Sequence, residues 1–135
     1  MVSVESLGRP MSRAERVLQE QRPMLEQFLA DVGLHDVQKP LDLRASLAGF
    51  DSWLRAQDVN PDDVAYLAAQ LGAYLSLYLV DFHGAEQVAV DERILIRVPV
   101  TAGVLREFDA YNLAYGCALQ KPCEFRKLVE AVVPV

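Results

Sequence analysis

Cysteine and histidine, which carry much of the metal and thiol chemistry of proteins, are scarce in this chain. The 135 residues include two cysteines, Cys117 and Cys123, and two histidines, His35 and His83. The spacing of the cysteines matches neither a CxxC redox pair nor a usual zinc half-site. Neither histidine is paired at i, i+3 or i, i+4. We therefore expect no metal and no cofactor, and we interpret the cysteines as packing residues.

Positive charge is also in short supply. The chain has 13 Lys and Arg against 19 Asp and Glu, a formal net charge of -6, and residues 1–63 hold 7 basic and 11 acidic side chains. A negative surface repels phosphate backbones, and no basic cluster with interleaved aromatics is present, so nucleic-acid binding is not expected. A basic protein partner fits this charge balance.

The first ten residues, MVSVESLGRP, lack a basic segment followed by an apolar one. No secretory signal is evident, and we expect a cytoplasmic protein. Residues 1–11 are expected to form a loosely ordered segment ahead of a single domain, since the length suits one core.

One long run without charge stands out, Val64 to Val80. Asn60-Pro61-Asp62-Asp63 precedes it and supplies a cap, a proline for the first turn and two carboxylates, which predicts a helix. The flanks are acidic and have no Lys or Arg collar, so the run indicates a buried core helix and not a membrane span. Its small-residue side, with Ala65, Ala69 and Ala73, is expected to face a neighbouring helix.

Periodicity and caps predict the other elements. Ser12 and Glu15 form a capping box at the start of a helix that Pro23 is expected to kink or divide. Asp91-Glu92-Arg93 separates two β-branched runs, which predicts a hairpin. The expected fold is α+β, helix-rich, with three N-terminal helices, a small antiparallel sheet of two or three strands and two C-terminal helices. The predicted elements span 13–32, 41–57, 64–80, 86–90, 94–98, 104–108, 110–119 and 123–133.

The end of the apolar run carries the best local candidate for acid–base chemistry. Asp81 and His83 are two residues apart, so in an extended segment the carboxylate would orient the imidazole as a general base. No nucleophile elbow or phosphate-binding glycine loop accompanies them. We expect no catalytic residues and interpret Asp81 as an exposed residue at the helix end.

Tyrosines recur at i, i+4 in two predicted helices, as Tyr74 with Tyr78 and Tyr111 with Tyr115. Tyrosines are typical of binding surfaces and cavity rims as well as of core edges. A groove lined by both pairs is the predicted binding site, although placement at the edge of the core explains the same pattern.

The segments Leu71–Leu75, LGAYL, and Phe108–Leu113, FDAYNL, flank the predicted hairpin. Residues 60–133 therefore resemble small uncharacterised bacterial α+β proteins with an LGxYL-type helix and an FDPY-like segment. Ala110 stands where that segment has proline. The resemblance implies a fold and no activity.

Three function classes stay open. The leading one is a non-enzymatic bacterial cytoplasmic protein of accessory or immunity type, binding a basic partner through an acidic helical face with Asp58, Asp62 and Asp63. The alternative is a small-molecule-binding protein or enzyme with a pocket between the sheet and the tyrosine-bearing helices, ringed by Tyr78, His83 and Tyr111. The third is a structural subunit, such as a homodimer, which a large exposed apolar patch would favour.

Overall fold

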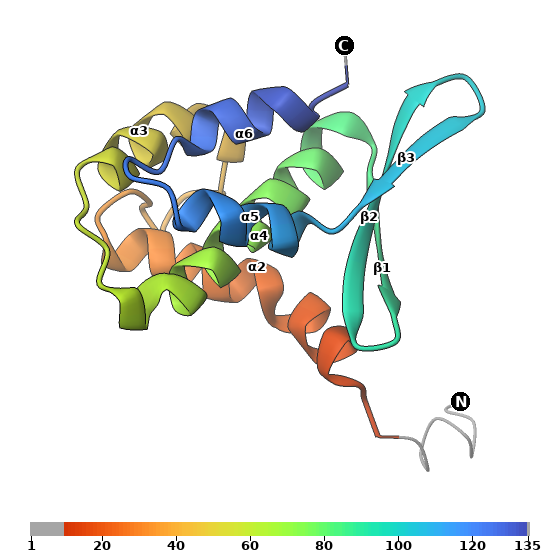
Figure 1. Cartoon of the computed structure of the whole chain (residues 1–135), viewed down its shortest axis with the longest axis horizontal. Helices are drawn as coiled ribbons and strands as arrows, with labels where there is room; N and C mark the ends of the chain where they lie inside the picture. Colours follow the sequence, from red (N-terminus) through yellow and green to blue (C-terminus); the bar gives the residue numbers. More distant parts are fainter. Residues whose placement is uncertain (1–9, 135) are drawn as a thin grey trace.

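A computed structural model describes residues 10–134, and the uncharged run forms its central helix, α4, Val64–His83 (Figure 1). The 3-10 turn η1, Pro61–Asp63, leads into it, and the Asn60 side chain accepts a hydrogen bond from the Asp62 amide. Gly84 ends the helix with φ 65°, a left-handed conformation that suits glycine. Residues 71–79 are all buried, so α4 organises the core.

The start of α4 corrects one prediction. Ala65 and Ala69 are exposed, whereas Ala73 is buried, and the buried residues between the first two are Leu67 and Ala68. The small residue that permits close packing is Gly72. An added Cβ there would lie 2.4 Å from the nearest ring atom of Tyr111, on α5, Ala110–Ala118. The close approach between α4 and α5 is therefore at Gly72.

Two N-terminal helices pack on α4. The predicted capping box is formed by Ser12 and Glu15 at the start of α2, Arg13–Asp31. The helix runs through the exposed Pro23 as one element, so of the two expected outcomes, a kink or a division, the division does not occur. The next helix, α3, Leu43–Arg55, begins at Asp42, whose side chain accepts from the amides of Arg44 and Ala45.

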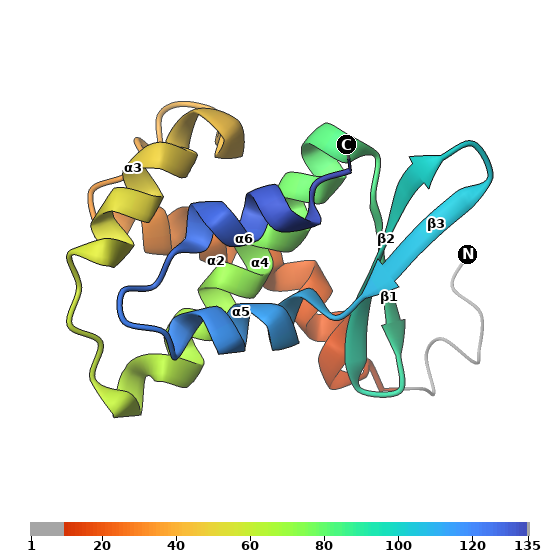
Figure 2. The same cartoon turned by 45° about the horizontal axis from the view of Figure 1, so that its top comes forward.

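The sheet lies at one end of the helical layer (Figures 1 and 2). Strands β1, Glu86–Val90, β2, Arg93–Thr101, and β3, Val104–Phe108, pair antiparallel in the order β1-β2-β3. The far end of the β2–β3 hairpin projects away from the helices. There Val104 and Leu105 are 53% and 61% exposed, on an edge strand.

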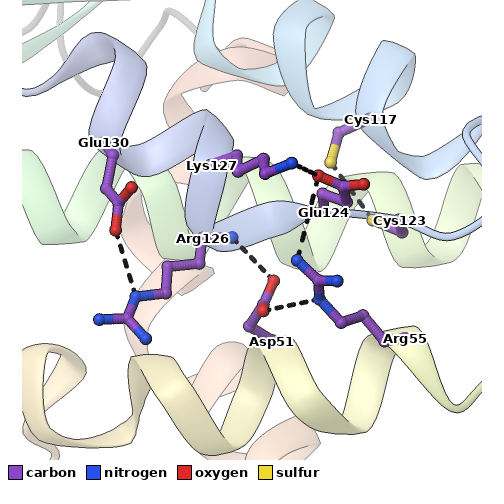
Figure 3. A network of polar contacts seen from close by, with 8 residues as sticks. All are labelled: Asp51, Arg55, Cys117, Cys123, Glu124, Arg126, Lys127 and Glu130. Atoms are coloured by element: carbon purple, nitrogen blue, oxygen red, sulfur yellow. Dashed lines mark hydrogen bonds and ion pairs between the residues drawn. The ribbon is translucent and has the colours of Figure 1, made fainter.

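The C-terminal helices complete the core. Besides α5, the helix α6, Phe125–Val132, lies beside α3, and one carboxylate joins the two. Asp51, buried in α3, accepts a hydrogen bond of 2.9 Å from the Arg126 backbone amide and one of 3.0 Å from Arg55 Nε (Figure 3). An aromatic cluster lies nearby: the Phe50 ring stacks on Tyr74, and Phe125 meets both edge-on.

The observed order of elements, helices, then an antiparallel sheet, then helices, confirms the α+β prediction for the described residues. The segment Pro61–His83 is long and apolar enough to cross a membrane by length and composition, which is weak evidence for a span. In the structure 67% of its most apolar window is buried among the other elements, as expected of a core helix. The predicted N-terminal segment lies largely outside the described residues.

Candidate functional site

The four predicted tyrosines do not line one groove. Tyr74 is fully buried, and its hydroxyl donates to the Leu43 carbonyl oxygen. Tyr115 is 47% exposed on α5, while Tyr111 packs on Gly72. These positions place Tyr74 in the core, Tyr111 in a helix contact and Tyr115 at the surface.

The space between the sheet and the tyrosine-bearing helices is occupied by a polar network. Gln21 of α2 and Gln87 of β1 donate to each other, at 2.9 and 2.7 Å. Gln21 Nε2 also donates to the Tyr111 hydroxyl at 2.7 Å. These side chains hold α2, β1 and α5 together where the alternative function places a pocket.

Asp81 and His83 are not paired with each other. Both lie in the last turn of α4, where residues two apart point in different directions. Asp81 instead accepts two hydrogen bonds from the Arg22 guanidinium, at 2.7 and 3.0 Å, and this contact raises the pKa of Arg22. The extended geometry that a His–Asp pair requires is therefore absent.

His83 stacks on Tyr78, with ring centroids 5.9 Å apart. Burial first, and then the positive charge of Arg44, lower the pKa of His83. Arg44 lies over the Phe82 ring at 4.2 Å. The two aromatic residues of the predicted site, Tyr78 and His83, are thus together, with a guanidinium beside them.

Tyr78 also lines a hollow of about 470 Å³ between α3 and α6. Arg44 and Arg126 line it together with apolar side chains and Glu130, which accepts a hydrogen bond of 3.2 Å from Arg126 Nε. Tyr78 is 8% exposed, and within residues 10–134 the buried side-chain polar atom without a partner is Ser76 Oγ, not the Tyr78 hydroxyl. This hollow, and not the space at the sheet, is lined by one of the predicted tyrosines.

The three predicted aspartates lie together at the start of α4. Asp62 and Asp63 belong to η1, while Asp58 is in the loop before it, and all three are exposed. Lys121 Nζ approaches Asp58 Oδ1 at 3.9 Å, but both side chains are almost fully solvated, so this pair contributes little. The three predicted carboxylates are therefore accessible, but they lie on the loop and the 3-10 turn before α4 and not on a helical face.

Aromatic rings adjoin these carboxylates in a hollow of about 370 Å³, which we call the acidic aromatic hollow. Phe28 is its base, and the rings of Trp53 and Tyr66 each meet Phe28 edge-on with centroids 5.9 Å apart. Tyr66 is 57% exposed. The remaining lining residues are Gln57, Asp58, Val59, Asn60, Asp63 and Leu67.

The acidic aromatic hollow favours a cation. Its lining contains two carboxylates and no basic side chain. Ring faces attract Lys and Arg, and carboxylates add Coulomb attraction to the same charge. The arrangement suits a lysine or arginine side chain that lays its stem on the rings and its charge against Asp58 or Asp63.

Sequence reasoning found the carboxylates of this hollow and missed its rings. Tyr66 follows Asp63 by three residues in one helical turn, a spacing that could have indicated a shared face. Trp53 and Phe28 come from two other helices, and nothing local in the sequence brings them to the aspartates. Their meeting depends on how α2 and α3 pack on α4.

No group of three or more His, Cys, Asp or Glu side chains within residues 10–134 is placed to hold a metal ion. Comparison with protein-family models, with curated proteins and with solved structures gave no match. The function is therefore argued from the site alone.

Proposed function

We propose that this chain is a bacterial cytoplasmic protein that works by binding a basic protein partner, without catalysis of its own. The single observation that supports this best is the acidic aromatic hollow, because it places exposed carboxylates beside an exposed ring. A lysine or arginine side chain of the partner enters the hollow, and Asp62 adds to the acidic rim.

The contributions of rings and carboxylates are separable by their physics. A cation over an exposed ring gains about 0.5–1 kcal/mol, so Tyr66→Leu is expected to weaken binding by about 2–5-fold. Attraction to exposed carboxylates is screened by salt over a distance of about 10 Å at 0.1 M ionic strength. Affinity should therefore fall as salt rises, and less steeply once Asp58 and Asp63 are neutralised.

Trp53 makes a direct experiment feasible, since it is the chain's only tryptophan and it lines the hollow. Titration with a short oligolysine peptide is expected to change Trp53 fluorescence, with a dissociation constant that rises with salt. The double variant Asp58→Asn/Asp63→Asn should bind more weakly. Its matched control is Asp91→Asn/Glu92→Gln, which removes the same charge from the exposed β1–β2 turn, away from the hollow (Figure 1).

Equal weakening by both double variants would show that net charge attracts the peptide and that the hollow does not. No fluorescence change at any salt concentration would refute the proposal. A triple variant that adds Asp62→Asn tests the whole predicted acidic face, and circular dichroism checks that each variant is folded.

A second candidate function is the binding of a small organic anion in the Tyr78 hollow. The observation that favours it is the Tyr78 side chain, which lines the hollow together with Arg44 and Arg126. A screen of small carboxylates by thermal shift tests it. A ligand of this site should stabilise the wild type and lose affinity in Tyr78→Phe, whereas unchanged affinity would place the ligand elsewhere.

A further inference from the structure

The two cysteines lie in contact. The Sγ atoms of Cys117, on the last turn of α5, and of Cys123, just before α6, are 3.3 Å apart (Figure 3). Both are free thiols and both are buried, with 5% and 4% of their surface exposed. A disulfide needs the sulfur atoms at about 2.05 Å, so a displacement of little more than 1 Å separates the pair from a bond.

Most of the chain between the two cysteines is exposed and lies outside regular secondary structure. Residues 118–122 contain the end of α5 and an irregular connection, and residues 119–122 are exposed. Neither a strand nor a helix interior has to shift for the sulfur atoms to approach. The contact therefore lies between α5 on one side and an exposed, irregular connection on the other.

Each thiol is near the surface despite its burial. Cys123 lines a hollow of about 390 Å³ together with Lys121, and Cys117 lines another of about 590 Å³ together with Lys127. A small reagent can therefore approach either sulfur, past Lys121 and Lys127, which are paired with Asp58 and Glu124 in the same hollows.

The two thiols are not equivalent. The hydrogen bond between them is the largest influence on both: it lowers the pKa of Cys117 and raises the pKa of Cys123, with burial adding to the latter. The charge of Asp51 opposes a negative charge on either sulfur, and that of Glu124 opposes one on Cys117. Cys117 is the thiol more easily ionised, and once it is a thiolate the Cys123 thiol, 3.3 Å away, can donate to it.

We propose that Cys117 and Cys123 form a redox-active dithiol that reacts reversibly with low-molecular-weight disulfides. The Cys117 thiolate attacks one sulfur of the disulfide, forms a mixed disulfide and releases one thiolate. Cys123 then loses its proton to solvent and attacks Cys117 Sγ, which releases the second thiolate and leaves a Cys117–Cys123 bond. The protein loses two electrons and two protons, and the reagent disulfide is reduced to two thiols.

The test uses the full chain and glutathione buffers of varied ratio of reduced to oxidised form. After acid quenching, intact mass measures the fraction that has lost two hydrogen atoms. Because packing holds the thiols in contact, the equilibrium constant for disulfide formation should exceed that of the urea-unfolded chain by on the order of tenfold or more. An equal or lower value in the folded protein would overturn the proposal.

Single variants test the order of the steps. Cys123→Ser should accumulate one glutathione on Cys117, because the second thiol is missing, while the wild type should show almost no mixed disulfide. Wild-type protein that stops at the mixed disulfide, or that forms disulfide-linked dimers in place of the internal bond, would also overturn the proposal. The comparison of folded with unfolded wild type needs no variant, so it stands even if a serine destabilises the core.

Discussion

Gly72 offers the sharpest test of the packing between α4 and α5. A Cβ at this position would lie 2.4, 2.7 and 2.8 Å from three ring atoms of Tyr111. Carbon atoms in favourable contact are about 3.5–4.0 Å apart, so the ring would have to move as a whole. Its hydroxyl is held by Gln21 at 2.7 Å, which resists that movement. Gly72→Ala is therefore expected to destabilise the protein.

The magnitude follows from two opposing terms. Overpacking costs about 1–3 kcal/mol, and alanine is favoured over glycine within a helix by about 1 kcal/mol. Gly116 supplies the matched control, because it also lies within a helix and an added Cβ there meets no atom within 4 Å. Gly116→Ala should therefore gain only the stability that alanine has over glycine within a helix, about 1 kcal/mol. The difference between the two variants then isolates the steric cost, about 1–3 kcal/mol.

Urea unfolding followed by Trp53 fluorescence provides the assay. The free energy of unfolding falls with urea at ~2 kcal/mol/M, so the urea midpoints of the two glycine variants should differ by roughly 0.5–1.5 M, with that of Gly72→Ala the lower. Replacing Tyr111 by alanine in the Gly72→Ala background should remove the penalty, because the clashing ring is gone. If both glycine variants raise the midpoint equally, the close approach between α4 and α5 is wrong.

Three further outcomes are expected. Tyr74→Phe leaves the Leu43 carbonyl without its donor and should lower the free energy of unfolding by about 0.5–1.5 kcal/mol, measured in urea. Asp51→Ala should cost more, about 1–3 kcal/mol, because it leaves the Arg126 amide without its acceptor, whereas Asp51→Asn retains an acceptor and should cost less. The pKa of His83 is lowered in the folded state, so as the pH falls the unfolded chain binds the proton first and stability should fall below about pH 6.5. His83→Gln should flatten that part of the profile of stability against pH, measured by thermal unfolding. A profile that the variant leaves unchanged would contradict the role of His83.

Local signals accounted for the elements of this fold. The capping box of Ser12 and Glu15 spans three residues, and the cap of Asn60 acts on the next turn, so both can be recognised in a short window of sequence. Asp109 likewise begins α5 by accepting from the Asn112 amide. The strands followed from β-branched runs on either side of a polar turn. These interactions are short in sequence, which is why the α+β class could be predicted.

The candidate sites were predicted less well, because their partners are distant in sequence. Asp81 was considered with its neighbour His83, but it pairs with Arg22, 59 residues away. Tyr111 was considered with Tyr115 and instead meets Gln21 and Gly72. A helix fixes which residues share a face, yet it does not say which other helix covers that face.

The sequence by itself therefore determined the helices, the strands, the buried course of α4 and the acidic character of the segment before it, since each depends on neighbours within a few residues. Only the tertiary structure decided that Trp53 and Phe28 meet Tyr66 beside Asp63, and that two cysteines of unremarkable spacing lie 3.3 Å apart. The physical reason is that the packing of helices and loops brings side chains together across long stretches of chain, and packing is a property of all the elements at once.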